Sequence, residues 1–432
     1  MTLAATDSQA SVTPPGRRRP TQALKRLGWG VADQGISSLS NLALGLFVAR
    51  SFGASSFGAF ALAFLTYSVV INAARGLATD PLLVRFSGDA NERWRHATSS
   101  ALGTALAVGV ITGTLCVVAG LLLPDPVGPA FVALGVGLPG LATQDSWRFA
   151  FFAGGRGRSS FVNDLSWTVL LVLALVLMHS QGESSAVRCL LAFGGTATLA
   201  AVLGAVQART FPRLRRARQW LAAQSSLSFR YLVENVSISG ASQIRSFVVG
   251  GVVSLAAVGQ VRASEMLMGP FFVVLMGISQ VAVPEASRVF ERDPSRLRRF
   301  CFLLGALQAS LAILWGVIIM TVFPLGPGAA ILKDLWTPTA RLVPAIALTV
   351  AAASFVTAAT AGLRAMGVSR RSLRAQLIGS ALYLVGGIAG AVLGGAVGTS
   401  WGVTAALSIS ALVWWHQLRS ALTEHSMRVE AR

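Results

Sequence analysis

RWRHATSSALGTALAVGVITGTLCVVAGLLLPDP is the sequence of residues 93–126, and its central part from Thr98 to Leu123 contains no Asp, Glu, Lys or Arg. About twenty consecutive apolar residues in a helix are enough to cross the hydrocarbon core of a bilayer. Two arginines, Arg93 and Arg95, precede this part, and the next charged residue after it is Asp125. The stretch therefore predicts a transmembrane helix over 98–123 that has one basic end.

The same charge pattern recurs along the chain. Of its 36 Lys and Arg residues, 28 lie in every second gap between the long apolar stretches and 4 lie in the other gaps. Basic residues near membrane segments stay on the cytoplasmic side, so we expect the basic gaps to be inside. The outer gaps contain Arg50, Arg188, Lys333 and Arg341. The inner clusters are 17–26, 85–95, 156–158, 209–230, 288–299, 364–374 and 419–432.

Twelve apolar stretches long enough to span a membrane are expected as helices, which makes the protein all-α and polytopic. Because the number is even, both termini should be cytoplasmic. The basic, Ser- and Pro-containing segment before the first helix reads as a disordered tail. The expected spans are 27–49, 58–78, 98–123, 127–153, 160–179, 186–207, 231–254, 256–284, 298–322, 342–363, 372–394 and 396–417.

Composition supports a membrane protein, since 53% of the residues are hydrophobic and 12% are charged. A soluble domain is much more polar. The net charge of +19 would suggest nucleic acid in a soluble protein. Here the basic residues flank membrane helices, so anionic membrane lipids are the expected partner instead. The three cysteines, Cys116, Cys189 and Cys301, lie in apolar stretches without ligand spacing, and no disulfide or metal site is expected.

The two halves of the sequence repeat. Asp33 in the first expected helix matches Glu234 in the seventh, and the Gly-x-x-Arg-x-Ser turn at 155–160 matches the turn at 367–372. Six helices per half give both halves the same direction, so an axis along the membrane normal should relate them. The expected parts are the tail 1–26, an N-terminal lobe 27–207, a basic cytoplasmic linker 208–230, a C-terminal lobe 231–417 and a second cytoplasmic tail 418–432.

Motifs of soluble enzymes do not explain the chain. Gly135, Gly137 and Gly140 have the spacing of a dinucleotide-binding loop, but they lie inside a membrane stretch with no strand before them. Gly386, Gly390 and Gly394 give GxxxG spacings that favour close helix packing. There is no phosphate-binding GxxxxGK[ST] loop, no HExxH and no GxSxG. We therefore expect neither an enzyme nor a cofactor.

Ionisable residues inside the expected spans carry the functional signal, because each costs roughly 2.5 to 3.5 kcal/mol to insert unless it has a partner or a wet cavity. Two pairs, Asp145 with Arg148 and Arg262 with Glu265, have the helical spacing i, i+3. Such neighbours can neutralise each other on one face of a helix. We expect these four residues to form structural ion pairs.

Five further ionisable residues have no such neighbour and need a partner on another helix or water: Asp33, Arg75, Asp164, Glu234 and Arg245. In the first helix Asp33, Ser37, Ser40 and Asn41 share one face, and in the seventh Asn235, Ser239, Ser242 and Ser246 do the same. Arg245 lies roughly 22 Å along its helix from Arg230, past the midplane. These stripes predict a central aqueous cavity between the two halves.

At these residues the chain resembles polysaccharide transporters of the O-antigen flippase type, which belong to the multidrug/oligosaccharidyl-lipid/polysaccharide exporter superfamily. The resemblance rests on DQG at 33–35, FGASSFG at 52–58, DPLLVR at 80–85 and the repeated Gly-x-x-Arg-x-Ser turns, and it covers about 25–420. It implies alternating access, location in a bacterial plasma membrane, and flipping of a polyprenyl-diphosphate-linked oligosaccharide to the outer leaflet for cell-surface polysaccharide export.

The resemblance also assigns roles to residues. Cavity arginines would hold the diphosphate or acidic sugars, so Arg245 and Arg75 are the expected substrate contacts, with Asn41 and Ser37 beside them in the pathway. Coupling to protons or sodium would use the acids Asp33, Glu234 and Asp164.

Two other functions stay open. The unpaired set holds three acids against two arginines, and a surplus of acid suits a cation-coupled multidrug exporter of the same superfamily. A membrane glycan polymerase or ligase is the third alternative. Such enzymes usually place their chemistry in a large outer loop, whereas the longest outer loop here, around 323–340, contains no His.

Overall fold

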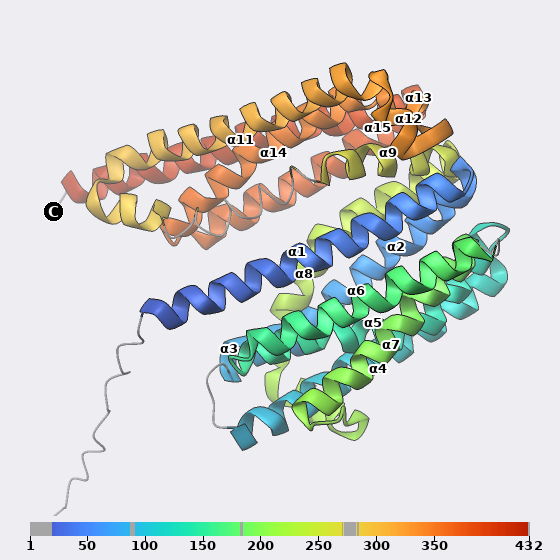
Figure 1. Ribbon diagram of the computed structural model, residues 1–432. Coiled ribbons are helices and arrows are strands. Elements are labelled where there is room, and N and C mark those ends of the chain that lie inside the picture. Colours follow the sequence, from blue (N-terminus) through green and yellow to red (C-terminus); the bar gives the residue numbers. More distant parts are fainter. Residues whose placement is uncertain are drawn as a thin grey trace, which may run out of the picture.

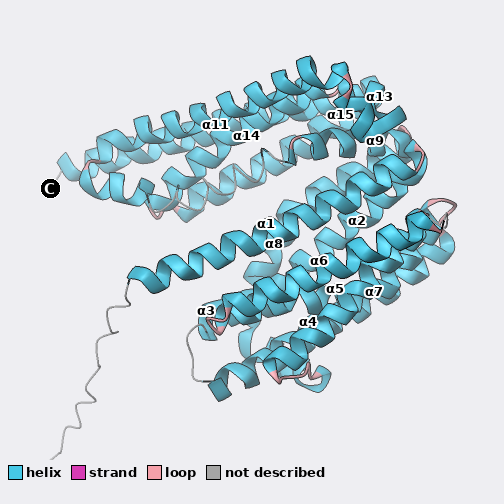
Figure 2. Cartoon of the chain, in the orientation of Figure 1, coloured by secondary structure: helices cyan, strands magenta, loops and turns pink. Residues whose placement is uncertain are grey.

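The structure is a computed structural model that describes residues 20–86, 91–181, 185–269, 271, 282 and 285–430. These residues form helices joined by short loops, and they contain no strand (Figure 2). The helices of the first half are α1 (Pro20–Ser51), α2 (Ala54–Ala74), α3 (Asp80–Phe86), α4 (Asn91–Leu122), α5 (Val127–Ala153), α6 (Gly157–Ser180) and α7 (Ala186–Ala208). Those of the second half are α8 (Ala217–Val252), α9 (Leu255–Leu267), α11 (Pro294–Val322), α12 (Pro327–Leu332), α13 (Trp336–Ala340), α14 (Val343–Ala365) and α15 (Ser369–Glu430).

Within the described residues, eight helical segments are long and apolar enough to cross a membrane. One of them is α15, which contributes two spans because its backbone leaves the helical conformation at Gly394 and Gly395. With the second span of α15 and with α1, α8 and α9, the number of helices that can cross the membrane is about twelve. α9 covers the first half of the expected eighth helix, and most of 268–284 lies outside the described residues. The predicted fold class, a polytopic all-α protein of two six-helix halves, is confirmed.

The helices form two groups (Figure 1). One group contains α2 to α7, the other contains α9, α11, α14 and α15, and α1 runs between them. α8 packs against α2 and against α15. The groups lie close together at the end where α12 and α13 are found, and they spread apart towards the end where α1 begins and α15 finishes (Figure 1). The first and last described residues therefore lie at the same end of the molecule.

Close approach between helices explains the glycine motifs. A Cβ on Gly137 of α5 would lie 2.8 Å from the Cα of Gly194 in α7, and a Cβ on Gly135 would lie 2.5 Å from the carbonyl oxygen of Gly113 in α4. In α15 a Cβ on Gly390 would lie 2.1 Å from the carbonyl oxygen of Gly398. Small residues at such contacts let helix backbones touch, as the GxxxG spacing predicted. Gly394 instead lies at the bend of α15.

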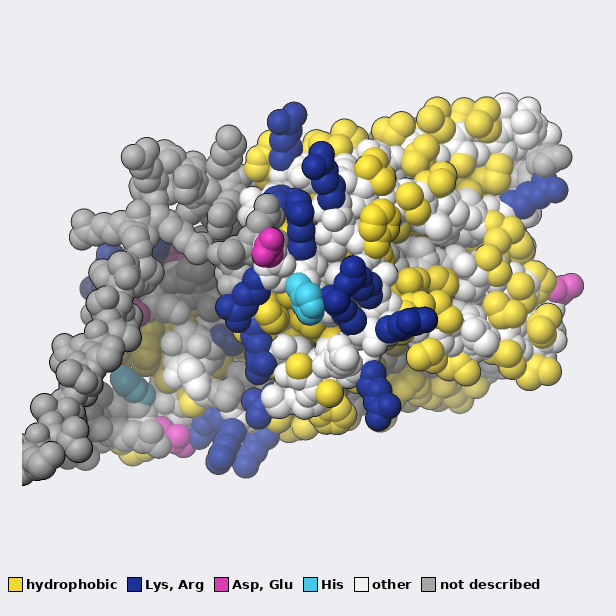
Figure 3. All heavy atoms as spheres, turned by 90° about the horizontal axis from the view of Figure 1, so that it is seen from below, with side chains coloured by type: hydrophobic (Ala, Val, Ile, Leu, Met, Phe, Trp, Pro, Cys, Tyr) yellow, Lys and Arg dark blue, Asp and Glu magenta, His cyan; other side chains and the backbone are white. Residues whose placement is uncertain are grey.

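The surface separates apolar from basic side chains. Leu121, Leu122 and Leu393 are among the large hydrophobic residues that are exposed, at 74%, 82% and 87%. Figure 3 shows one face on which hydrophobic side chains cover much of the right part, whereas most Lys and Arg side chains gather in the middle of the view. These basic side chains lie to the left of the apolar part, on the side where the two groups of helices spread apart (Figure 1). An apolar belt with one basic end is the surface of a multi-pass membrane protein.

Candidate functional site

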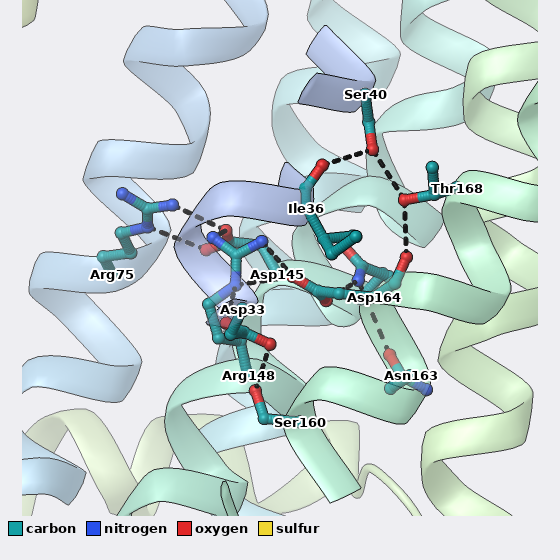
Figure 4. A network of polar contacts seen from close by, with 11 residues as sticks. Asp33, Ile36, Ser40, Arg75, Asp145, Arg148, Ser160, Asn163, Asp164 and Thr168 are labelled. Carbon is teal, nitrogen blue, oxygen red and sulfur yellow. Dashed lines mark hydrogen bonds and ion pairs between the residues drawn. The ribbon is translucent and has the colours of Figure 1, made fainter. Parts of the chain in front are cut away.

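A buried ion-pair network joins four helices of the first half (Figure 4). It includes Asp145 and Arg148, the expected i, i+3 pair on α5, but their nearest charged atoms are 4.0 Å apart. The better partner of Asp145 is Arg75, whose Nε and Nη2 lie 2.8 and 2.6 Å from its two carboxylate oxygens. The expected ion pair of Asp145 and Arg148 is therefore present, but each residue also has a closer partner on another helix. Both side chains project from α5 towards neighbouring helices that supply closer, two-point partners.

Arg148 lies between Asp33 of α1 and Asp164 of α6 (Figure 4). Its Nε is 3.1 Å from Asp33 Oδ2 and 2.9 Å from Asp164 Oδ2, and its Nη2 also contacts Asp164. Asp33 and Asp164 are each 1% exposed. Two residues that the sequence left without a neighbour thus share one guanidinium, which offsets part of the cost of burying them.

Polar side chains complete the surroundings of the two acids. Ser160 donates a hydrogen bond to Asp33 Oδ1 at 3.0 Å, and Gln144 donates one to Asp164 Oδ1 at 2.8 Å. Ser40 of α1 and Thr168 of α6 lie 2.6 Å apart. Two members of the polar stripe predicted on α1, Asp33 and Ser40, therefore face α6 through hydrogen bonds.

The charges of this network do not balance. Three carboxylates, Asp33, Asp145 and Asp164, meet two guanidiniums, Arg75 and Arg148. If all are ionised, the network carries one negative charge, which one proton or one monovalent cation would neutralise. The described residues contain no group of three or more His, Cys, Asp or Glu that could hold a metal ion.

Arg75 begins a π-helical turn, Arg75–Thr79, between α2 and α3, and the sequence analysis did not predict it. Side chains of α8 donate hydrogen bonds to this turn and to the Asp80 carboxylate next to it. Trp220 and Ser228 donate to the carbonyl oxygen of Leu77 at 3.2 and 3.1 Å, and Asn235 donates to Asp80 at 2.8 Å. Single π-helical turns inside α-helices are frequent at functional sites. The polar stripe on α8, which includes Asn235, was the feature of the sequence that could have indicated these contacts.

A cavity of about 440 Å³ lies between the two groups of helices. Its charged lining residues are Arg245, Arg262 and Glu265, from α8 and α9. Most other lining residues are apolar or aromatic, among them Phe57, Phe60, Phe64, Met266, Ile346, Val350 and Tyr383. Apolar walls with a few converging polar groups are typical of small-molecule sites.

A second, more polar cavity of about 140 Å³ adjoins it. Ser37, Arg75, Asp145 and Arg148 line this cavity, and Asn41 lines both cavities, as does Phe64. The structure thus places Arg245, Arg75, Asn41 and Ser37, the expected substrate-pathway residues, in the walls of two neighbouring cavities. Their role in transport stays a prediction.

The charged wall of the larger cavity is a group of three residues. Glu265 lies 3.2 Å from Arg262, as the i, i+3 spacing predicted, and 3.1 Å from Arg245. Arg245 was expected to lack a partner on its own helix, and its partner is on α9. With all three ionised, this group carries one positive charge.

Aromatic rings hold both guanidiniums. Arg245 lies 5.0 Å from the centre of the Tyr383 ring, and Arg262 lies 5.4 Å from that of Phe64. A Cβ on Gly387 would lie 2.7 Å from Arg245 Cδ, so this glycine leaves room for the arginine stem. Cation–π contact orients a guanidinium while leaving its edge available for hydrogen bonds.

Glu234, the remaining expected coupling residue, is part of α8. Its side chain is not among those that the structure describes, so its place relative to Asp33 stays a prediction. The structure therefore joins Asp33 and Asp164 in one network and leaves the repeat-based equivalence of Asp33 and Glu234 untested.

Comparison with known proteins gives matches in structure and none in sequence: no protein-family model matches the chain, and no curated protein does. An inward-facing multidrug resistance MATE family transporter of the MOP superfamily matches with a TM-score of 0.77 at 14% identity, over 90% of this chain and 95% of that one. The lipid II flippase MurJ in an inward closed conformation matches at 0.69 with 12% identity, over 93% and 90%. An outward-facing MATE family transporter matches at 0.56 with 15% identity, over 94% and 97%.

These likenesses show that the chain has the fold of MOP superfamily transporters, the superfamily that the sequence resemblance indicated. The match to the inward-facing structure is better than the match to the outward-facing one. This agrees with the two groups of helices, which spread apart at the basic end of the molecule (Figure 1).

Proposed function

We propose that this chain is a secondary transporter that flips a polyprenyl-diphosphate-linked oligosaccharide from the inner to the outer leaflet by alternating access, for export of cell-surface polysaccharide. The observation that carries the proposal is the net positive group of Arg245, Arg262 and Glu265 in the wall of an otherwise apolar cavity of about 440 Å³. Arginine forks match the oxygens of a diphosphate, and apolar walls suit the lipid to which it is attached.

Transport uphill needs a driving ion, and the first-half network supplies a site for one. Asp33 and Asp164 share Arg148, and the network as a whole has one negative charge in excess. Loading one proton or one sodium ion would neutralise it. Asn41 and Phe64 line both cavities, so the ion site and the substrate site are neighbours. Asp33, Asp164 and Glu234 are the proposed coupling residues.

A cation-coupled multidrug exporter is the second candidate. Glu265 is 27% exposed as a side chain and lines an aromatic cavity, which is an environment that also suits a cationic drug. Two of the three structural matches above are MATE family transporters. The net charge of the three-residue group favours the flippase, because a positive wall attracts a diphosphate and repels a cation.

The apolar belt and basic end of the surface support a proposal for the setting of the transporter. We infer that it lies in the bacterial inner membrane with both termini cytoplasmic, that its basic end binds anionic lipids, and that it is not an enzyme. The lobes would be 27–207 and 231–417, joined by the basic linker 208–230. The side chains of Arg209, Arg213, Arg215 and Arg218 in this linker are exposed.

Cells that lack the protein test the proposal. Lipid-linked oligosaccharide should accumulate facing the cytoplasm, and sensitivity to cationic dyes should not change. Hypersensitivity to dyes together with normal surface polysaccharide would favour the multidrug exporter instead.

A further inference from the structure

Glu265 contacts both arginines of the larger cavity at the same time. Its Oε1 lies 3.1 Å from Nη2 of Arg245, and its Oε2 lies 3.2 Å from Nη1 of Arg262. A carboxylate that forms a fork with one arginine uses both oxygens on a single guanidinium. Glu265 instead divides its oxygens between α8 and its own helix α9, so each guanidinium gives it one nitrogen.

The carboxylate of Glu265 lies where a negatively charged ligand would contact the two arginines. Arg245 and Arg262 are both in the cavity wall, and their planes are held by Tyr383 and Phe64. An anion that bridges the two guanidiniums as Glu265 does needs the nitrogens that now contact Glu265, Nη2 of Arg245 and Nη1 of Arg262. The carboxylate and the anion therefore compete for the same donors.

Burial does not force Glu265 into this position. The side chains of Arg262 and Glu265 are 28% and 27% exposed, whereas that of Arg245 is 5% exposed. Glu265 can move towards the open cavity and stay solvated, while Arg245 is fixed between α9 and α15. Arg245 is thus the buried member of the group, whereas Glu265 and Arg262 have room to move.

We propose that Glu265 is an internal counter-ion that stands in for the substrate anion in the empty cavity and displaces it after translocation. This inference rests on the proposed function. Two guanidiniums match the two negative charges of a diphosphate diester once Glu265 moves aside. Glu265 brings one charge to the two guanidiniums and a diphosphate brings two, so the diphosphate can displace Glu265, and Glu265 speeds its release by competing for the same arginines.

Binding of inorganic pyrophosphate to the purified protein in nanodiscs of neutral lipid tests the proposal by isothermal titration calorimetry. Glu265→Gln removes the competing charge and should bind pyrophosphate at least about tenfold more tightly than the wild type, which is a change of about 1.4 kcal/mol. Glu265→Asp keeps the charge but shortens the reach, so it should bind with intermediate affinity. Glu291→Gln removes an exposed acid outside the cavity and should leave the affinity unchanged.

The outcomes separate this inference from the proposed function. If Glu265→Gln and Glu265→Asp melt like the wild type but bind pyrophosphate equally or more weakly, the counter-ion role is wrong. If the wild type binds pyrophosphate no better than Arg245→Ala, the proposed anionic substrate itself is wrong. If the wild type binds a cationic dye and Glu265→Gln loses that binding, Glu265 is a ligand for cations and the proposal is overturned.

Discussion

Asp33 of α1 and Arg148 of α5 form a buried ion pair, with 3.1 Å between Oδ2 and Nε. The same arginine holds Asp164 of α6. α1 runs between the two groups of helices (Figure 1), so this pair ties a central helix to the first group. A change in the charge of Asp33 would alter that tie, which gives ion binding a direct route to the arrangement of the helices.

Replacement of Asp33 by Asn tests the coupling role. The amide keeps the shape of the carboxyl group but cannot gain or lose a proton. We expect Asp33→Asn, and likewise Asp164→Asn and Glu234→Gln, to abolish transport driven by an ion gradient while substrate binding is kept. Transport into vesicles with and without an imposed gradient measures this.

Ser160→Ala is the matched control, because it removes one hydrogen bond to Asp33 and no charge. It should lower gradient-driven transport much less than Asp33→Asn. Full gradient-driven transport by Asp33→Asn would rule out Asp33 as a coupling residue.

Neighbouring glycines of α7 give a test of the packing. A Cβ on Gly194 would lie 2.4 Å from the Cα of Gly137, whereas a Cβ on Gly195 would meet nothing within 4 Å. Overpacking of this kind costs about 1 to 3 kcal/mol. We expect Gly194→Ala to lower the Tm in detergent, and Gly195→Ala to leave it unchanged or raise it. Equal Tm values for the two variants would contradict the contact between α5 and α7.

Reporter fusions test the orientation. Fusions after residues 55, 183 and 335 should read external, and those after 90, 215 and 295 should read internal, because basic residues stay on the cytoplasmic side. An external reading after residue 215 would contradict the arrangement of two six-helix halves that run in the same direction.

The linker between α7 and α8 gives a test of lipid binding. Phe211 and Leu214 are 63% and 50% exposed in it, next to exposed arginines. Each basic residue near an anionic surface contributes about 1 kcal/mol. Arg213→Gln combined with Arg215→Gln should therefore weaken the preference for anionic over neutral lipid by about 2 kcal/mol, as measured by lipid competition in nanodiscs.

Lys333→Gln combined with Arg341→Gln is the control for that measurement. It removes two exposed positive charges from the opposite end of the molecule. An equal loss of preference in the two double variants would show that total charge, and not the linker, determines lipid binding.

The helices and their order could be predicted from the sequence because membrane spans depend on local composition. The expected span 127–153 is the observed α5, and the expected 186–207 differs from α7 by one residue. Both GxxxG residues at 386 and 390 lie at close helix contacts. Hydrophobicity and charge asymmetry act residue by residue, so neighbouring structure is not needed to interpret them.

Pairing across helices could not be predicted in the same way. The i, i+3 spacing suggested Asp145 with Arg148, but the shorter contacts are with Arg75, Asp33 and Asp164, from three other helices. Which residue faces which depends on helix rotation and packing. The π-helical turn at Arg75 could not be predicted for the same reason. Its Leu77 carbonyl oxygen accepts hydrogen bonds from side chains of α8, which lies far along the chain.

Translocation in reconstituted vesicles tests the central claim most directly. Purified protein is inserted into vesicles that contain a fluorescent undecaprenyl-diphosphate-linked oligosaccharide, and its movement between leaflets is followed by the loss of fluorescence to an external quencher. We predict that the wild type moves the lipid, that Arg245→Ala abolishes movement at normal abundance, and that Arg245→Lys restores part of it, because an ammonium cannot replace a guanidinium fork on a diphosphate. A wild type that leaves this lipid in place but exports a cationic dye under an ion gradient would contradict the account.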